Sequence, residues 1–358
     1  MLILPTLNST FSLLEFERKD ENRAFRDSVE FNISNLDKFP PEFEEFYNDN
    51  FSFRRPLLDA YHYFKFNYYH ISPHPDKTII GLNDWYYNAG KEVEIFEGKL
   101  HFSKMDLNKF KNEWGKRLEY FNSLDIKSYW LICPFKHHIY PEYLPLNVSQ
   151  HNELKRLDQL KDYLDESFPG LIIDPTPELL AVKDSEILYY KLDNHWNMKA
   201  GYIASKLLLS KIQADFSNVQ IPDIQSYQWQ DSIIQGGIHY RVLGLEDNYD
   251  KQLYPIIENE KAVESIKYGF PPPKYFAYPW EYERRYINGV DSLGLTILVI
   301  RDSFGAQLIP FIKESFRESV FIFDAWQYDI NETIIEAVNP DIVVYISLET
   351  HLESFIED

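Results

Sequence analysis

Three residues of the sequence have the chemical types of a nucleophile, a base and an acceptor that orients the base. Asp193 and His195 are separated by one residue, so an extended backbone would point both side chains to the same side. The carboxylate of Asp193 could then fix the tautomer of His195 and stabilise its protonated form. Ser303 follows the apolar run TILVIRD, and its hydroxyl would lose its proton to such a base. Together these residues predict acyl transfer through a serine nucleophile.

Each half of this pattern also has a simpler explanation. An Asp-x-His pair often lies in a surface turn, and the chain has ten histidines, so chance pairs are expected. Asp302 and Ser303 could instead cap a following helix, because Asp and Ser favour that position. The residues after the histidine favour the catalytic interpretation: Trp196 is bulky, Asn197 suits an N-cap, and Gly201 follows within the predicted helix.

The composition limits the classes of function. The 358-residue chain can form one large domain, or a domain with a substantial appendage. Its formal net charge of −20 argues against nucleic acid as a partner, because nucleic acid binds basic surfaces. Cys133 is the only cysteine, so the chain can form neither an intramolecular disulfide nor a thiolate metal cluster. We expect no metal and no cofactor. Aromatic residues make up 16% of the chain, and any exposed rings would suit a sugar-binding groove.

The first residues, MLILPTLNSTFSLLEF, form a short apolar patch. They lack the basic start and long apolar run of a signal peptide, and they are too short to span a bilayer. No later segment is apolar enough to span one. The patch is either a true cytoplasmic start or a stub from which an anchor has been removed.

The elements that must position the site alternate between helix and strand. Residues 1–75 predict a charged helical region, with apolar residues at three- and four-residue steps in its second half. We expect two strands around a turn at 81–84, and further strands at 128–135, 170–177, 319–326 and 340–349. Helices are expected at 103–125, 150–166, 197–212 and 331–338. Residues 294–316 predict a strand, a tight turn and a helix. Such alternation is typical of an α/β fold with a mainly parallel sheet. We therefore predict a three-layer α/β/α domain over 76–358, with an irregular insertion at about 217–290 that covers one face of the sheet.

In this arrangement Ser303 falls at the carboxyl edge of the sheet, where ligands bind. The helix predicted after it would aim its free N–H groups and positive dipole end at the same point. The N–H of Ser303 itself could help to stabilise an oxyanion.

Several residues are weaker candidates for contact with a substrate. Lys136, His137 and His138 follow a predicted strand end, where they could line the groove or be solvated. The two histidines lack a carboxylate at ligand spacing, so they do not predict a metal site. Arg301 could hold an acyl oxygen, although pairing with a carboxylate is favoured. Trp196 is a further candidate because it adjoins the proposed base.

Two more pairs have both a functional and a structural interpretation. Arg284 and Arg285 could contact an anionic acceptor, but ordinary surface charge is the better explanation. Trp326 and Tyr328 follow a predicted strand, and they could stack on a sugar ring or pack in the core or at its rim.

Five segments of the chain together resemble a known family. DNHWNMKAGY resembles the Asp-x-His-Trp signature of the alginate O-acetyltransferase-like branch of the SGNH hydrolases, which includes AlgX-like, AlgJ-like and DHHW proteins. Four other segments resemble family motifs and occur in the expected order: NDNFSFRRPLL, GLNDWYYN, CPFKHHIYPEYLP and IRDSFGAQLIPF. The resemblance covers most of residues 45–350. Arg301 departs from the glycine that commonly precedes the Asp-Ser pair.

The resemblance implies an SGNH hydrolase-like fold with Ser303 as nucleophile, His195 as general base and Asp193 as its orienting group. It implies a polysaccharide O-acetyltransferase acting on an extracytoplasmic glycan, with a membrane-bound O-acyltransferase as the partner that supplies acetyl groups. We expect the protein to work in the periplasm or elsewhere outside the cytoplasmic membrane, tethered by a segment outside this sequence. Two alternatives stay open: a carbohydrate acetyl esterase with the same triad, and a catalytically silent scaffold that binds a glycan or a partner.

Overall fold

The structure is a computed structural model that describes most of the chain. The described residues are 7–8, 11, 14, 26, 29–31, 33, 36–152, 154–243, 249–257, 260–289, 294–324 and 326–356. Internal contacts divide the chain into two compact units, Met1–Pro75 with Val242–Leu245 and Asp76–Arg241 with Glu246–Asp358. Among the helices in these described ranges, none has the length and apolar character needed to cross a membrane.

Two α-helices of the first unit lie within residues 36–75, which the structure describes throughout. They are α2 (Phe39–Asn50) and α3 (Arg54–Tyr63), and α3 continues into a π-helix at Phe64–Tyr68. The predicted helical region is interrupted at Phe51, whose extended backbone ends α2. No residue of these three helices is fully buried, although several of them, such as Phe46 and Tyr47, are half-buried.

The second unit is built on a seven-stranded sheet in the order β4-β3-β11-β9-β10-β8-β7. Its strands are β3 (Lys127–Cys133), β4 (Ile172–Ile173), β7 (Ala262–Glu264), β8 (Glu283–Asn288), β9 (Thr296–Arg301), β10 (Glu318–Phe323) and β11 (Ile342–Leu348). The first five strands in the order are parallel, whereas β8 and β7 are antiparallel additions at one edge. A separate hairpin pairs β1 (Thr78–Ile80) with β2 (Tyr86–Asn88) around the predicted turn.

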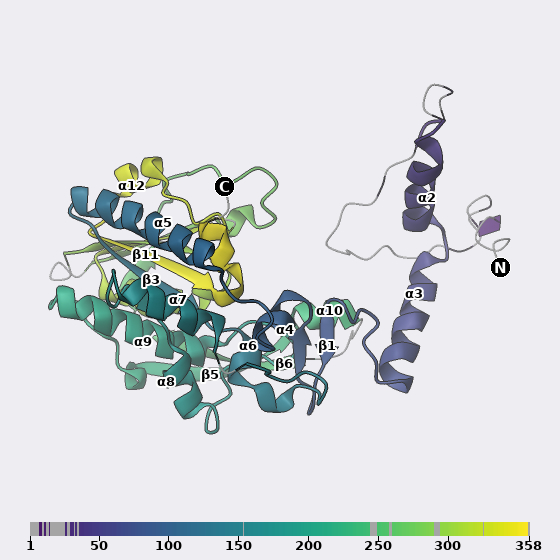
Figure 1. Cartoon of the computed structure of the whole chain (residues 1–358), viewed down its shortest axis with the longest axis horizontal. Helices are drawn as coiled ribbons and strands as arrows, with labels where there is room; N and C mark the ends of the chain where they lie inside the picture. The colour runs from purple at the N-terminus through teal and green to yellow at the C-terminus, as the bar shows by residue number, and fades with distance from the viewer. Residues whose placement is uncertain are drawn as a thin grey trace. The chain divides into compact units, whose positions relative to one another are not determined.

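Helices cover both faces of this sheet (Figure 1). One face packs against α5 (Lys104–Ser123), α7 (Arg156–Asp165) and α12 (Glu332–Val338), and the other against α8 (Thr176–Val182) and α9 (Met198–Asp215). The remaining α-helices are α4 (Lys91–Phe96), α6 (Lys136–Ile139), α10 (Ile238–Leu243) and α11 (Ile309–Ile312). Alternate residues of the central strands contribute to the two core clusters, as Leu298 and Val299 of β9 do. The predicted α/β/α arrangement with a mainly parallel sheet is confirmed.

Two features of the sequence determine the strands and the helix next to the site. Every residue of β9 and β11 is buried, as expected for central parallel strands that are covered on both faces. The side chain of Asn197 caps α9 by accepting hydrogen bonds from the N–H groups of Lys199 and Ala200. The N-cap of α9 is therefore fixed two residues after His195.

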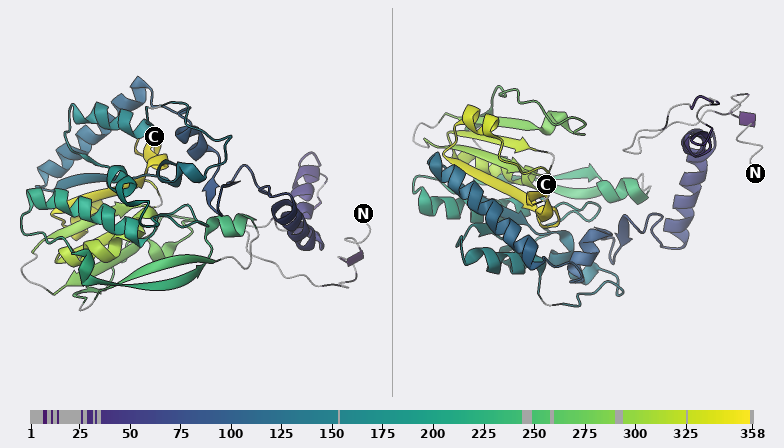
Figure 2. Two further views of the ribbon diagram at one scale, coloured as in Figure 1. Left: turned by 90° about the horizontal axis from the view of Figure 1, so that it is seen from below. Right: turned by 45° about the horizontal axis from the view of Figure 1, so that its top comes forward.

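The segment 217–290 is more regular than predicted. It contains a long two-stranded ribbon, β5 (Tyr227–Gln235) and β6 (Tyr249–Ile257), and it also supplies β7 and β8 (Figure 2). The ribbon does not cover a face of the sheet: Tyr227 packs on Tyr202 of α9 and Phe311 of α11. The expectation of an irregular cover was wrong because most ribbon residues are exposed or half-buried, and the sequence lacks a clean apolar alternation.

Candidate active site

The loop before α9 has a backbone arrangement that brings Asp193 and His195 together. A single antiparallel bridge pairs Tyr189 with Trp196, and the N–H of Tyr190 donates to the carbonyl of His195 at 3.2 Å. Inside this loop the N–H of His195 donates to Oδ1 of Asp193 at 2.9 Å. The carboxylate is thus fixed on the same side as the imidazole by the backbone of the histidine itself.

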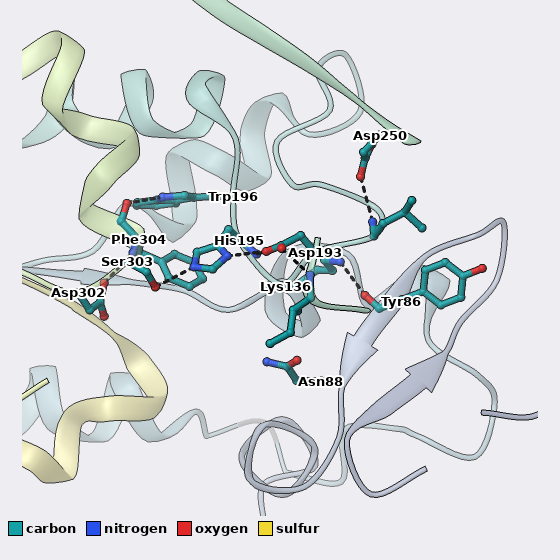
Figure 3. A network of polar contacts seen from close by, with 12 residues as sticks. Tyr86, Asn88, Lys136, Asp193, His195, Trp196, Asp250, Asp302, Ser303 and Phe304 are labelled. Carbon is teal, nitrogen blue, oxygen red and sulfur yellow. Dashed lines mark hydrogen bonds and ion pairs between the residues drawn. The ribbon is translucent and has the colours of Figure 1, made fainter. Parts of the chain in front are cut away.

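Asp193, His195 and Ser303 form a continuous row of hydrogen bonds (Figure 3). Nδ1 of His195 lies 2.5 Å from Oδ1 of Asp193, and Nε2 lies 2.7 Å from Oγ of Ser303. Because an ionised carboxylate only accepts, Nδ1 carries the proton, and Nε2 of the neutral ring is left to accept from the serine hydroxyl. These are the contacts that activation of a serine by a histidine requires.

The two ionisable groups of the row shift each other's pKa. Burial alone would raise the pKa of Asp193, but the charge of His195 and its hydrogen bonds hold that pKa well below its usual range. Burial alone would lower the pKa of His195, but the Asp193 carboxylate outweighs burial and holds that pKa above its ordinary value. The pair therefore favours an ionised aspartate beside a basic imidazole.

Asp193 is held on its other side by the segment that follows β5. The N–H of Ile238 donates to Oδ2 of Asp193 at 2.9 Å, and Gly237 lies against the carboxylate so closely that a Cβ there would be 1.8 Å from the same oxygen. Asp250 of β6 accepts from the N–H of Leu192 at 3.0 Å. The insertion therefore helps to build the site, which the sequence did not predict. The only local signal is the Gly-Gly pair in QGGIH.

Ser303 lies two residues after β9, at the carboxyl edge of the sheet, as predicted. Its side chain does not cap a helix, because the N–H of Phe304 is bonded to Oδ1 of Asp302 at 2.8 Å. The expected helix is also wrong: Phe304–Leu308 is a 3₁₀ helix, and α11 after it spans only four residues. No long helix therefore directs its dipole at Ser303, contrary to the prediction. Within the described part of the chain, the backbone N–H of Ser303 donates no hydrogen bond.

Asp302 anchors the serine turn from within the protein. It is fully buried, and its Oδ2 accepts hydrogen bonds from the N–H of Leu348 at 2.6 Å and the hydroxyl of Tyr328 at 2.9 Å, with Nδ1 of His351 at 3.3 Å. Burial alone would raise the pKa of Asp302, but these partners hold it below its ordinary value. From the sequence, Asp302 was predicted only as a possible helix cap, and its role as an anchor was missed.

Trp196 packs inside the protein and does not face a substrate. It is fully buried, and its Nε1 donates to the carbonyl of Phe304 at 2.9 Å. One turn further on, a Cβ at Gly201 would lie 2.3 Å from the carbonyl oxygen of Gln307. Both contacts join the start of α9 to the turn that carries Ser303. We therefore correct the interpretation of Trp196 from substrate contact to positioning residue.

Lys136, His137 and His138 are buried, so they neither line an open groove nor lie in solvent. Nζ of Lys136 donates to the carbonyls of Tyr86 at 2.6 Å and Lys191 at 3.2 Å (Figure 3). Burial lowers the pKa of Lys136 to about 7, although Asp193 and other nearby carboxylates act in the opposite direction.

The two histidines pair with buried carboxylates. His137 lies 3.4 Å from Glu92, and His138 lies 3.0 Å from Glu349. Among the described residues, no group of three or more His, Cys, Asp or Glu side chains could hold a metal ion.

The three arginines proposed as weak candidates all pair with carboxylates. Arg301 is buried, and its guanidinium lies 3.4 Å from Glu281 and over the ring of Phe323, so the structural interpretation fits better than contact with an acyl group. Burial lowers the pKa of Arg301 to about 10. Arg284 and Arg285 pair with carboxylates at the edge of the sheet, as expected for surface charge.

Tyr328 and Trp326 differ sharply in accessibility. Tyr328 is fully buried, with its hydroxyl on Asp302, so it cannot stack on a sugar ring and the interpretation as a substrate contact was wrong. Trp326 is half-buried, and its ring packs edge-on against Phe323 and His351. It therefore lies at the rim of the core, where one part of its ring stays accessible.

The parallel sheet with helices on both faces, and a Ser-His-Asp row at its carboxyl edge, define the class of SGNH hydrolase-like domains. Within that class, residues 79–251 match the family model of the SGNH hydrolase-like domain of the acetyltransferase AlgX. The resemblance to the alginate O-acetyltransferase-like branch is thereby confirmed. The matched region includes Asp193 and His195 but ends before Ser303. No curated protein matches the chain.

Solved structures share the fold over most of the chain. PatB1 of Bacillus cereus superposes with a TM-score of 0.53 at 14% identity, covering 79% of this chain and 98% of that one. A DHHW family protein from Eubacterium siraeum DSM 15702 superposes with a TM-score of 0.51 at 16% identity, and the match covers 79% of this chain and 96% of that one. The O-acetyltransferase domain of Pseudomonas putida AlgJ superposes with a TM-score of 0.52 at 12% identity, and the match covers 79% of this chain and 93% of that one. At these identities the likeness shows the fold alone.

Proposed function

We propose that this protein is a polysaccharide O-acetyltransferase that works through an acetyl-Ser303 intermediate. The observation that carries the proposal is the row of hydrogen bonds from Asp193 through His195 to Ser303. The match of residues 79–251 to an acetyltransferase family supports acyl transfer as the reaction class. The names of the structural neighbours, which include an O-acetyltransferase domain, agree with that class.

In the first half-reaction, Nε2 of His195 takes the proton from Oγ of Ser303 as the oxygen attacks the carbonyl carbon of an acetyl donor. Asp193 stabilises the imidazolium that forms. The imidazolium then returns its proton to the leaving group of the donor, and the acetyl group stays on Ser303. The N–H of Ser303, which has no acceptor in the described part of the chain, can donate to the oxyanion.

The second half-reaction runs the same steps in reverse. His195 takes the proton of a sugar hydroxyl, the sugar oxygen attacks the acetyl carbon, and Oγ of Ser303 leaves with the proton from His195. Water can replace the sugar, since 28% of the His195 side chain is exposed, and the protein would then act as an acetyl esterase. Transfer exceeds hydrolysis only if the bound acceptor excludes water from the site.

The partner and the compartment are part of the proposal and come from the family resemblance. We propose that a membrane-bound O-acyltransferase supplies the acetyl group, and that the reaction takes place in the periplasm or otherwise outside the cytoplasmic membrane. A segment outside this sequence would tether the protein there.

The nucleophile is tested by intact mass after incubation with a chromogenic acetyl ester, beside Ser303→Ala as the control. One added acetyl group that maps to Ser303 and is absent from the control supports the proposal. A sulfonyl fluoride is a useful second probe, because PatB1 has been solved with a sulfonyl adduct. Folded protein with neither adduct nor ester turnover would contradict the proposal and favour the binding scaffold.

A further inference from the structure

An aromatic cluster lies at the same edge of the sheet as Ser303. It consists of the rings of Phe276, Tyr278, Trp280, Phe323 and Trp326. Phe323, the last residue of β10, pairs in register with Arg301, the last residue of the neighbouring parallel strand β9. Ser303 follows β9 by two residues and Trp326 follows β10 by three. The nucleophile and the cluster therefore occupy adjacent strand ends.

Polar contacts link the cluster to the serine turn. His351 lies 3.3 Å from Asp302, the residue before the nucleophile, and its ring is 6.2 Å from that of Trp326. On the other side, the guanidinium of Arg301 lies 5.0 Å from the ring of Phe323. These contacts place the cluster next to the turn that carries Ser303.

The outer rings of the cluster are exposed, although a stable fold would normally cover them. Trp280 is 64% exposed and Tyr278 is 41% exposed. The ring of Tyr278 is held flat against Phe323, with 9° between the planes, and Trp280 stands edge-on to Tyr278. With the half-buried Phe276 and Trp326 these rings form one contiguous aromatic surface, and contiguous exposed apolar patches mark binding sites.

The backbone conformation and the indole N–H of Trp326 independently indicate a functional site. Its φ of +65° is a left-handed backbone conformation that a bulky residue seldom adopts. Such conformations persist where the surrounding structure enforces them, and they cluster at functional sites. Its Nε1 is shielded from solvent but has no hydrogen-bond acceptor among the described residues, so it is an unused donor beside the exposed rings.

We propose that the aromatic cluster is a subsite for an uncharged pyranose ring of the acceptor glycan. The proposal rests on the proposed acetyl transfer and specifies its substrate class. The C–H face of a pyranose packs on an aromatic ring, while its hydroxyls need donors and acceptors around the ring. The His351 ring, which is 32% exposed, and the Glu281 carboxylate, which is 37% exposed, supply these.

Charge favours a neutral sugar over a uronate. Glu281 borders the cluster and engages the nearby Arg301, and a second carboxylate, Asp324, lies between Phe323 and Trp326 in sequence. Arg284 pairs with Glu264 at 2.9 Å, and Nζ of Lys267 donates to the carbonyl of Trp280 at 3.3 Å. With a net charge of −20 on the whole chain, a polyanionic acceptor would have to approach against the field.

The test measures binding of neutral oligosaccharides to the full chain carrying Ser303→Ala. Calorimetry with tetramers of β-1,4-glucose, β-1,4-N-acetylglucosamine and α-1,4-glucose, and with an oligoguluronate, gives the affinity of each. We expect at least one neutral tetramer to bind, and Trp280→Ala and Trp326→Ala each to weaken that binding at least tenfold. Tyr249→Ala removes an aromatic ring that is 58% exposed on the ribbon and serves as the matched control, with unchanged affinity. Circular dichroism checks the fold of each variant.

Three outcomes would overturn the subsite. They are no saturable binding of any neutral tetramer, unchanged affinity in both folded tryptophan variants, and tighter binding of the oligoguluronate than of every neutral tetramer. Binding is measured without a working nucleophile, so failure of the subsite is separate from failure of the acetyl-Ser303 proposal. The latter is judged by the mass adduct on the wild-type chain.

Discussion

The contact between Gly237 and Asp193 allows a perturbation that leaves all three proposed catalytic residues in the sequence. In Gly237→Ala the new methyl carbon would lie 1.8 Å from Oδ2 and 2.4 Å from Cγ of Asp193, whereas ordinary contact begins at 3.4 Å. Either the carboxylate or the backbone around Gly237 must move by more than an ångström. Movement of either breaks the bond from the N–H of Ile238 to Oδ2 and turns Asp193 relative to His195.

Two comparisons give the lower and upper limits of the expected loss of activity. Misplacement of a reacting group by about 1 Å costs about 100-fold in rate. Loss of the orienting function of the aspartate in a Ser-His-Asp triad costs about 10⁴-fold. We expect kcat/KM for a chromogenic acetyl ester to fall between these limits, which corresponds to roughly 3–5 kcal/mol of transition-state stabilisation.

Gly289→Ala is the matched control, because a Cβ at that position meets no atom of the described residues within 4 Å. It should retain the wild-type rate, and thermal unfolding of both variants separates loss of activity from loss of fold. If Gly237→Ala were folded and its kcat/KM stayed within threefold of the wild-type value, the claim that this contact positions Asp193 would be refuted.

Four further predictions concern Asp193, His195, Asp302 and Lys136. Asp193→Asn should lower kcat by about 10⁴-fold, because the amide no longer fixes the tautomer of His195. His195 must be neutral to act as a base, so the wild-type rate should rise with pH through a pKa above the ordinary 6.5 of histidine. In Asp193→Asn this rise should move to lower pH. pH–rate profiles of both proteins measure the two effects. Asp302→Asn should destabilise the fold by about 2–4 kcal/mol, because its amide cannot accept all the buried hydrogen bonds that the carboxylate accepts, and urea unfolding against the wild type checks this. Lys136 has its pKa lowered to about 7 when folded, so between pH 7 and its unfolded value of 10.5 the unfolded chain binds more protons and stability rises with pH. Lys136→Met should lack that rise, and equal slopes of unfolding free energy against pH in both proteins would contradict it.

Sequence periodicity was enough to predict the sheet and its helices. The fully buried strands β9 and β11 are continuous apolar runs, and α5 has a capping box at Ser103, so both kinds of element are evident from the residues alone. The ribbon was missed because β5 and β6 are mostly exposed or half-buried, and their pairing depends on partners more than ten residues apart. The helix after Ser303 was predicted wrongly because its apolar spacing suits an α-helix, whereas the structure forms 3₁₀ turns around a four-residue α11.

The candidate site was only partly visible for a different reason. Asp193, His195 and Ser303 were found because their chemistry requires those residue types. The residues that hold Asp193 in place were not found. Gly237 acts through its close approach to the carboxylate and Ile238 through its backbone N–H, and neither contact can be predicted from the residue type. Tyr328 shows the converse error: an aromatic residue after a strand end suggested a sugar contact, but its hydroxyl serves a buried carboxylate.

These contacts explain why a tryptophan and a glycine accompany the Asp-x-His pair. The histidine and the serine are 108 residues apart in sequence, and their 2.7 Å contact exists only if the start of α9 docks on the turn at 303–308. Trp196 fixes that docking through its bond to the carbonyl of Phe304, and Gly201 permits it by leaving room for the carbonyl of Gln307. Neither residue needs to touch a substrate. The segment HWNMKAG therefore combines a base with the surface that places it, so loss of the indole hydrogen bond should separate His195 from Ser303 while the Asp193–His195 bond within the loop stays intact.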